Sequence, residues 1–140
     1  MNLTQCQAYS QQKPEAELSY PFDPDVPVYK VCGKMFALFT LKGNYTQGKH
    51  PQMNLKCLPH HAQELRDVFD TIKPGYHMNK QHWNSLVLDG SLPDTEIQRL
   101  IDHSYALVVS KLPKTARNRL ETLYSKDKLY AGLSPYQQQD

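Results

Sequence analysis

The 140-residue chain lacks the features that define several large classes of protein. No apolar run approaches the roughly 20 residues that a transmembrane helix needs, and the N-terminal residues contain no signal-peptide core. The three cysteines are widely spaced and form no CxxC pair. There is no P-loop and no GxGxxG motif, which argues against a nucleotide cofactor. These absences predict a soluble, reduced, cytoplasmic protein of one domain that carries no cofactor.

The chain also has little net charge, and the charge that it has is unevenly placed. Sixteen basic and fourteen acidic residues give a formal net charge of only +2. Residues 111–128 nevertheless hold six basic side chains against two acidic ones, Glu121 and Asp127. A local excess of this kind suits a polyanion such as nucleic acid, although a solvated basic segment produces the same pattern. Both interpretations stay open at this point.

Alternating residues predict a hairpin and a further strand in the first half of the chain. A short helix over residues 3–9 comes first, and Pro14 stops it. Val28–Val31 and Met35–Leu41 then flank a turn in which Gly33 supplies the positive φ that a tight hairpin needs. Gln52–Cys57 alternates between polar and apolar residues, which is typical of a half-buried strand. The polar face of that strand carries Gln52, Asn54 and Lys56.

Helical spacing dominates the second half of the chain. Residues 59–69 and 97–112 predict a short and a long amphipathic helix, and Ser91-Leu-Pro-Asp94 fits a capping box ahead of the long one. Between them, Ile72–Met78 and Trp83–Leu88 read as a strand pair. Strand pairs joined by short turns need no crossover helix. The order of elements therefore predicts an α+β fold with a mainly antiparallel sheet.

Five segments together resemble one family, MmcQ/YjbR. They are VYKVCGKMFAL, NLKC, PGYHMNKQHWN, LDGSLPD and LIDHSYALVVSKLPK, and the resemblance runs from about Glu15 to Lys114. It implies a double-wing fold like that of the phage transcription factor MotA, with hairpin wings and a curved antiparallel sheet flanked by helices. It also implies DNA binding, and no catalytic residues. The chain departs from the family at Cys32, where a glycine is common.

The resemblance divides the chain into a single α+β domain over residues 1–114 and a C-terminal extension over residues 115–140. The extension is expected to be part helical, from Thr115 to Tyr124, and disordered from residue 134 onward. The apolar stripe of this helix would dock on the body of the domain, and its arginines would add phosphate contacts. The stripe consists of Ala116, Leu120, Leu123 and Tyr124.

Two groups of polar residues are candidates for contacting DNA. The turn around Tyr76–Trp83 offers cationic and hydrogen-bonding side chains, but a purely structural role for the same turn is also open. Lysines on neighbouring strands could line one sheet face and follow a phosphate backbone, unless that face is simply solvated. With the extension, the predicted nucleic-acid-binding residues are Lys30, Lys34, Asn54, Lys56, His77, Asn79, Lys80, His82, Arg117 and Arg119.

A protein-protein interaction module without nucleic-acid binding is the alternative. Convergence of Lys30, Lys34, Lys56 and Lys80 on one face would favour DNA, whereas an exposed apolar patch would favour a protein partner. No metal site is expected, because the histidines and cysteines lack ligand spacing. Adjacent Asp102 and His103 do not share a helix face and so form no dyad. We therefore expect a monomeric protein that is not an enzyme and does not contact membranes.

Overall fold

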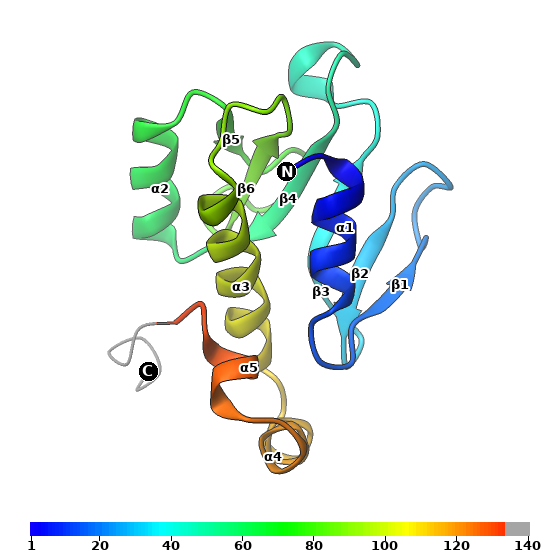
Figure 1. Ribbon diagram of the computed structural model, residues 1–140, viewed down its shortest axis with the longest axis vertical. Coiled ribbons are helices and arrows are strands. Elements are labelled where there is room, and N and C mark those ends of the chain that lie inside the picture. The colour runs from blue at the N-terminus through cyan, green and yellow to red at the C-terminus, as the bar shows by residue number, and fades with distance from the viewer. Residues whose placement is uncertain (134–140) are drawn as a thin grey trace.

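A six-stranded antiparallel sheet lies behind a layer of helices in the computed structural model, which describes residues 1–133 (Figure 1). The strand order is β1-β2-β3-β4-β6-β5. The strands are β1 (Glu17–Ser19), β2 (Val28–Val31), β3 (Lys34–Thr40), β4 (Gln52–Lys56), β5 (Ile72–Pro74) and β6 (Trp83–Val87). The helices are α1 (Leu3–Gln11), α2 (Pro59–Val68), α3 (Asp94–Ser110), α4 (Lys114–Leu123) and α5 (Lys126–Tyr130), with a 3-10 turn, η1 (Asn44–Thr46). The predicted α+β fold is confirmed.

Three local predictions need correction. Strand β1 was not predicted, because three residues between prolines show no periodicity. Strand β5 ends at Pro74 rather than Met78, and the chain up to Trp83 is a turn. Helix α3 begins at Asp94, with Pro93 as its N-cap residue and no side-chain cap, so the expected capping box does not form.

The hairpin of β2 and β3 forms where the sequence predicts it, and it contains a bulge. Cys32 and Gly33 have φ angles of 48° and 77°, the two positive values that a type I′ turn requires. The register then shifts between Tyr29 and Lys30, so that β3 has one residue more than β2. The bulge turns Phe36 into the core, where it packs against Tyr105. The centroids of the two rings lie 5.2 Å apart, in an edge-to-face arrangement.

The Ser104 hydroxyl joins helix α3 to the sheet beside this bulge. The β3–β4 pairing begins only at Ala37 and Leu55, so the strands are unpaired on the Phe36 side. The fully buried Ser104 hydroxyl donates to the Phe36 carbonyl at 2.6 Å and accepts from the Lys56 N–H at 2.8 Å. One side chain thus satisfies two backbone groups that the sheet leaves without partners.

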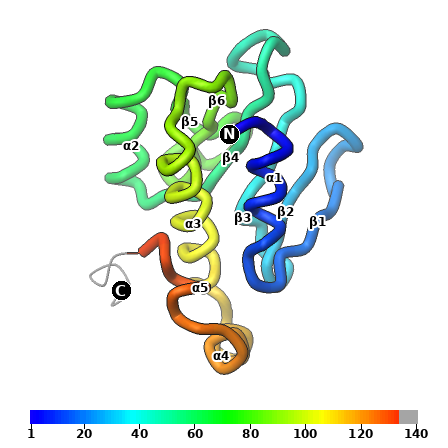
Figure 2. Tube along the Cα trace, viewed as in Figure 1, coloured from blue at the N-terminus to red at the C-terminus, as the bar shows by residue number. Residues whose placement is uncertain are grey.

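Helices α4 and α5 belong to the same core as the rest of the chain. Leu120 and Leu129 are buried, whereas Leu123, predicted to be part of the docking stripe, is 59% exposed. The segment after α5 runs so close to α3 that a Cβ atom at Gly132 would lie 2.1 Å from the His103 backbone nitrogen. Figure 2 shows α1 and α5, from the two ends of the chain, beside α3. The expected disorder from residue 134 onward lies outside the described residues.

Replacing Ser104 by Ala should lower the free energy of unfolding by about 2–3 kcal/mol, because it leaves a buried carbonyl and a buried N–H without partners. Ser110→Ala on the same helix is the matched control, since the Ser110 hydroxyl only donates to Leu107 within the helix. It should change the value by less than about 0.5 kcal/mol. Urea denaturation measures both. Equal effects of the two substitutions would contradict the bridging role of Ser104.

Candidate functional site

The face of the sheet away from the helices carries most of its charge as lysine. Strand register puts Lys30 opposite Glu17, Lys56 opposite Trp83, and Lys73 opposite Ser85. These residues alternate with the buried residues of the core, so they point to the other side. We call this side of the sheet the outer face. Of the four lysines whose convergence on one face would favour DNA over a protein partner, Lys30 and Lys56 therefore lie on the outer face.

Lys56 is a cation of the outer face whose pKa is lowered by its surroundings. Its side chain is half-buried at the end of β4. Burial, and after it the positive charge of Lys111, hold the pKa of the Lys56 ammonium below its ordinary value. Both causes disfavour the cation, and the opposite charge of a bound anion would favour it again. Perturbed groups of this kind gather at functional sites, although structural surroundings also produce them.

A second basic group surrounds the turn between β2 and β3. Lys34 is exposed at the start of β3. Helix α4 brings Arg119 to the same turn, 3.8 Å from the Cys32 Sγ. The Arg119 guanidinium holds the Glu15 carboxylate with two hydrogen bonds of 2.7 and 3.0 Å, and this contact keeps the pKa of Glu15 below its ordinary value. Arg119 is therefore already engaged within the chain.

Arg117, the other predicted arginine, is engaged as well. It is half-buried, and its guanidinium donates to the Ser110 carbonyl at 3.3 Å. That carbonyl lies in the last turn of α3, where helix carbonyls have no partner within the helix. Both arginines of α4 thus help to attach the extension to the body of the domain.

The turn of residues 75–82 lies beside the Lys56 end of β4, since the Cys57 N–H donates to the His82 carbonyl at 2.8 Å. Asn79 shapes the turn by accepting from the Gln81 N–H at 2.9 Å. The Lys80 ammonium donates to the Gly75 carbonyl at 3.2 Å. His77, at a φ of 58°, is exposed. The turn thus has the structural role left open above, and it also carries Lys80, His77 and the exposed His82 beside the end of β4.

Asn54 does not reach the solvent. It is only 2% exposed; its carbonyl oxygen accepts from the Ser85 hydroxyl at 2.5 Å, and its amide donates to the Tyr76 carbonyl at 3.2 Å. The loop that contains Tyr45 folds over this part of the outer face. The centroids of the Tyr45 and Tyr76 rings lie 5.7 Å apart. Both sides of β4 are therefore buried at this point, although its residues alternate between polar and apolar. Asn54 is not part of the candidate site, because it is inaccessible to a ligand.

The adjacent residues Asp102 and His103 of α3 contact different neighbours, as the sequence predicts. Asp102 pairs with Lys13, and His103 lies 2.9 Å from the Gly132 carbonyl through Nδ1. The His103 Nε2 accepts from the Leu58 N–H at 3.4 Å, and burial lowers the pKa of this imidazole. Residues 1–133 contain no group of three His, Cys, Asp or Glu side chains placed to hold a metal ion. No helix in that range is both long and apolar enough to cross a membrane.

Two cations near the candidate site were missed by the sequence reasoning, Lys73 and Lys111. Lys73 falls in a strand whose three residues are too few to show which side each faces. Lys111 follows α3 in sequence, and only the packing of α3 across the sheet brings it near Lys56. No pattern in the sequence could have placed either one.

Comparison with known proteins gives one consistent result. The family model YjbR matches residues 11–107. The chain is 36% identical over 123 residues to "Uncharacterized protein YjbR" of Escherichia coli K12, covering 88% of this chain and all of that one. It is 37% identical over 108 residues to YbdF of E. coli O157:H7, covering 76% of this chain and 84% of YbdF.

Solved structures agree with this result. The Deinococcus radiodurans protein DR2400, of the family-model domain DUF419, is similar with a TM-score of 0.75 and 31% identity, covering 86% of this chain and 88% of that one. A Pseudomonas syringae protein is similar with a TM-score of 0.67 and 33% identity, covering 76% of this chain and 98% of that one.

The three thiols should differ sharply in reactivity. Burial raises the pKa of Cys6 to about 11 and that of Cys57 to about 12, whereas Cys32 is exposed at its turn. Because the thiolate is the reactive form, a disulfide reagent at pH 8 should label one thiol of the native protein and three after denaturation. Mass spectrometry of the labelled peptides identifies the site. Rapid labelling of Cys57 in the native state would contradict the described core.

Proposed function

The chain belongs to the YjbR family, and on that premise we propose that it binds DNA through the outer face of its sheet and the turn of residues 75–82. The convergence of Lys30, Lys56 and Lys73 on that face carries the proposal. The only acidic side chain that the register places among them is Glu17, opposite Lys30. We further propose that the protein acts as a monomer in the cytoplasm, without a cofactor and without catalysing a reaction.

Lys56 is the central residue of this proposal. Burial, and after it the positive charge of Lys111, disfavour the charged form of Lys56, and a phosphate group bound to its ammonium would stabilise that form. His82 and Lys80 lie on the adjoining turn, which is bonded to the chain at Cys57, and their side chains would extend the contact along a nucleic-acid backbone. The strength of such binding depends on the number of phosphates neutralised and falls steeply with salt.

The proposed binding is weak and directed to the backbone rather than to base sequence. Lysine contacts to phosphate position a protein on DNA without reading it. The two asparagines that could have read a base edge are otherwise engaged, Asn54 in the core and Asn79 in its own turn. We therefore expect dissociation constants of about 10⁻⁴–10⁻⁶ M near physiological salt.

The basic C-terminal extension contributes less to this proposal than its charge alone suggests. Arg119 is paired with Glu15 and Arg117 with the end of α3. The extension also supplies Leu120 and Leu129 to the core, so truncation after Pro113 would damage the fold together with any binding site. Point substitutions on the outer face are the cleaner test.

The double substitution Lys30→Gln and Lys56→Gln should weaken duplex binding at low salt. It should also reduce the slope of log K against log salt by about 1.8, because each lost phosphate contact contributes about 0.9. Fluorescence anisotropy of a labelled duplex at several salt concentrations measures both quantities.

The matched control is Lys114→Gln with Lys126→Gln, which removes the same charge from the exposed surfaces of α4 and α5. It should leave the slope unchanged. Equal slopes for the two double variants would refute the outer face as the binding surface. A wild-type protein that fails to bind DNA at low salt would remove the proposal itself.

One observation favours the alternative, a protein-interaction module. Phe22, Tyr20 and Leu18 are 69%, 52% and 43% exposed along β1 and the loop after it. The same stretch carries Glu17 and Asp23 but no lysine or arginine, so it is unsuited to DNA. Phe22→Ser should therefore leave duplex affinity unchanged within about two-fold. A larger loss would place this loop in the DNA site and remove the support that it gives to a protein partner.

A further inference from the structure

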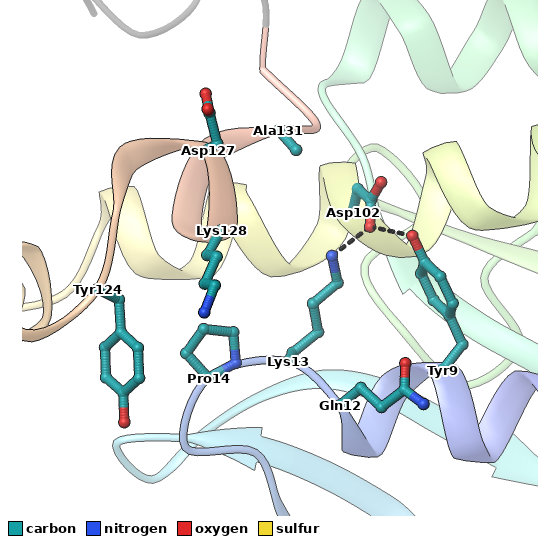
Figure 3. Close-up of a pocket in the computed structure, with 9 residues that line it drawn as sticks. All are labelled: Tyr9, Gln12, Lys13, Pro14, Asp102, Tyr124, Asp127, Lys128 and Ala131. Carbon is teal, nitrogen blue, oxygen red and sulfur yellow. Dashed lines mark hydrogen bonds and ion pairs between the residues drawn. The ribbon is translucent and has the colours of Figure 1, made fainter.

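A cleft opens on the helical side of the molecule, between the end of α1 and the α4–α5 segment (Figure 3). Its volume is about 360 Å³, enough for a small organic molecule. Its lining comes from three parts of the chain that only the fold brings together, residues 9–14, Asp102 on α3, and residues 124–131. The last of these lies beyond the residues that the family model matches.

The negative charge at the back of the cleft is already compensated. The Asp102 Oδ1 accepts from the Tyr9 hydroxyl at 2.9 Å and is ion-paired with the Lys13 ammonium (Figure 3). Burial and the neighbouring carboxylate raise the pKa of Tyr9 to about 12, so its hydroxyl stays a donor to Asp102. The Lys13 ammonium has three N–H groups, of which this pair uses one.

A second ammonium group enters the cleft from the opposite wall. In Figure 3 the Lys128 side chain runs from α5 toward Pro14, whereas the carboxylate of Asp127, which also lines the cleft, points in the opposite direction. Within residues 1–133 no carboxylate lies within ion-pair distance of Lys128. The lining thus holds two lysines and two aspartates, and Asp102 is paired with Lys13. Lys128, which has no such ion pair within residues 1–133, supplies the positive charge that can bind an anion.

The remaining walls are flat and largely apolar. The rings of Tyr124 and Tyr9 and the Pro14 ring line the cleft beside the two ammonium groups (Figure 3). Such walls favour a ligand with an apolar, preferably planar body next to its charged group. We propose that this cleft is a binding site for a small organic carboxylate, whose carboxylate lies between Lys13 and Lys128 and whose body packs against Tyr124 and Pro14.

Benzoate is a suitable probe, with benzamide as its neutral counterpart of the same shape and inorganic phosphate as an anion without an apolar body. We expect benzoate to shift the backbone amide NMR signals of residues 9–13 and 124–131 in a saturable way. Benzamide and phosphate should each bind at least about ten-fold more weakly. Equal binding of benzamide would refute recognition of the charge, and equal binding of phosphate would refute the role of the apolar walls.

Lys128→Met tests the ammonium group while keeping the length of the side chain. It should weaken benzoate binding about ten-fold, the loss expected for one charge-assisted hydrogen bond. Lys126→Met is the matched control, since it removes one charge from the same helix outside the cleft. It should change the affinity by less than about two-fold. Similar losses in the two variants, or signal shifts outside the cleft, would overturn the proposal. Because DNA is absent from these titrations, their outcome is independent of the proposed function.

Discussion

Four consecutive residues of α3 fix the helix to several neighbouring parts of the molecule. Successive residues of a helix point about 100° apart, so Asp102, His103, Ser104 and Tyr105 face four directions. Asp102 binds Lys13 after α1, and His103 lies against the Gly132 carbonyl and the Leu58 N–H. Ser104 joins the sheet, and the Tyr105 hydroxyl donates to the Pro14 carbonyl at 2.7 Å. The positions of α1, the C-terminal segment and the bulged strand all depend on this one turn of helix.

This arrangement leaves the two sides of the sheet with different surroundings. The helices cover most of one side, while the loops of Tyr45 and Tyr76 cross the outer face at β4 and β6. Lys30 and Lys56 stay partly accessible beside this cover. Lys56 is therefore only partly buried. Its surroundings disfavour its positive charge, yet an external anion can still reach the ammonium group. The proposed DNA surface and the proposed carboxylate cleft lie on opposite layers of the molecule.

Several elements could be predicted because their patterns are local. The β2–β3 hairpin depends on Gly33, and the long helix shows an uninterrupted apolar stripe over more than four turns. The separation of Asp102 from His103 also follows directly from helix geometry. Family membership follows equally from the sequence, because the motifs that carry it are contiguous. In contrast, the capping box expected at Ser91–Asp94 does not form, since the N-cap residue is Pro93, which has an extended backbone and no side-chain cap.

The sequence by itself thus determined the fold class, the hairpin, the main helices and the family, because each depends on residues close together in the chain. Tertiary structure alone decided which polar residues remain accessible. Asn54 and Lys56 look equivalent on one strand face, yet a loop 22 residues further along buries the first and leaves the second partly open. In the sequence Arg119 has no visible acidic partner, whereas in the fold it pairs with Glu15, which is 104 residues away along the chain. Accessibility and charge pairing depend on contacts between distant segments, and a linear pattern does not encode such distances.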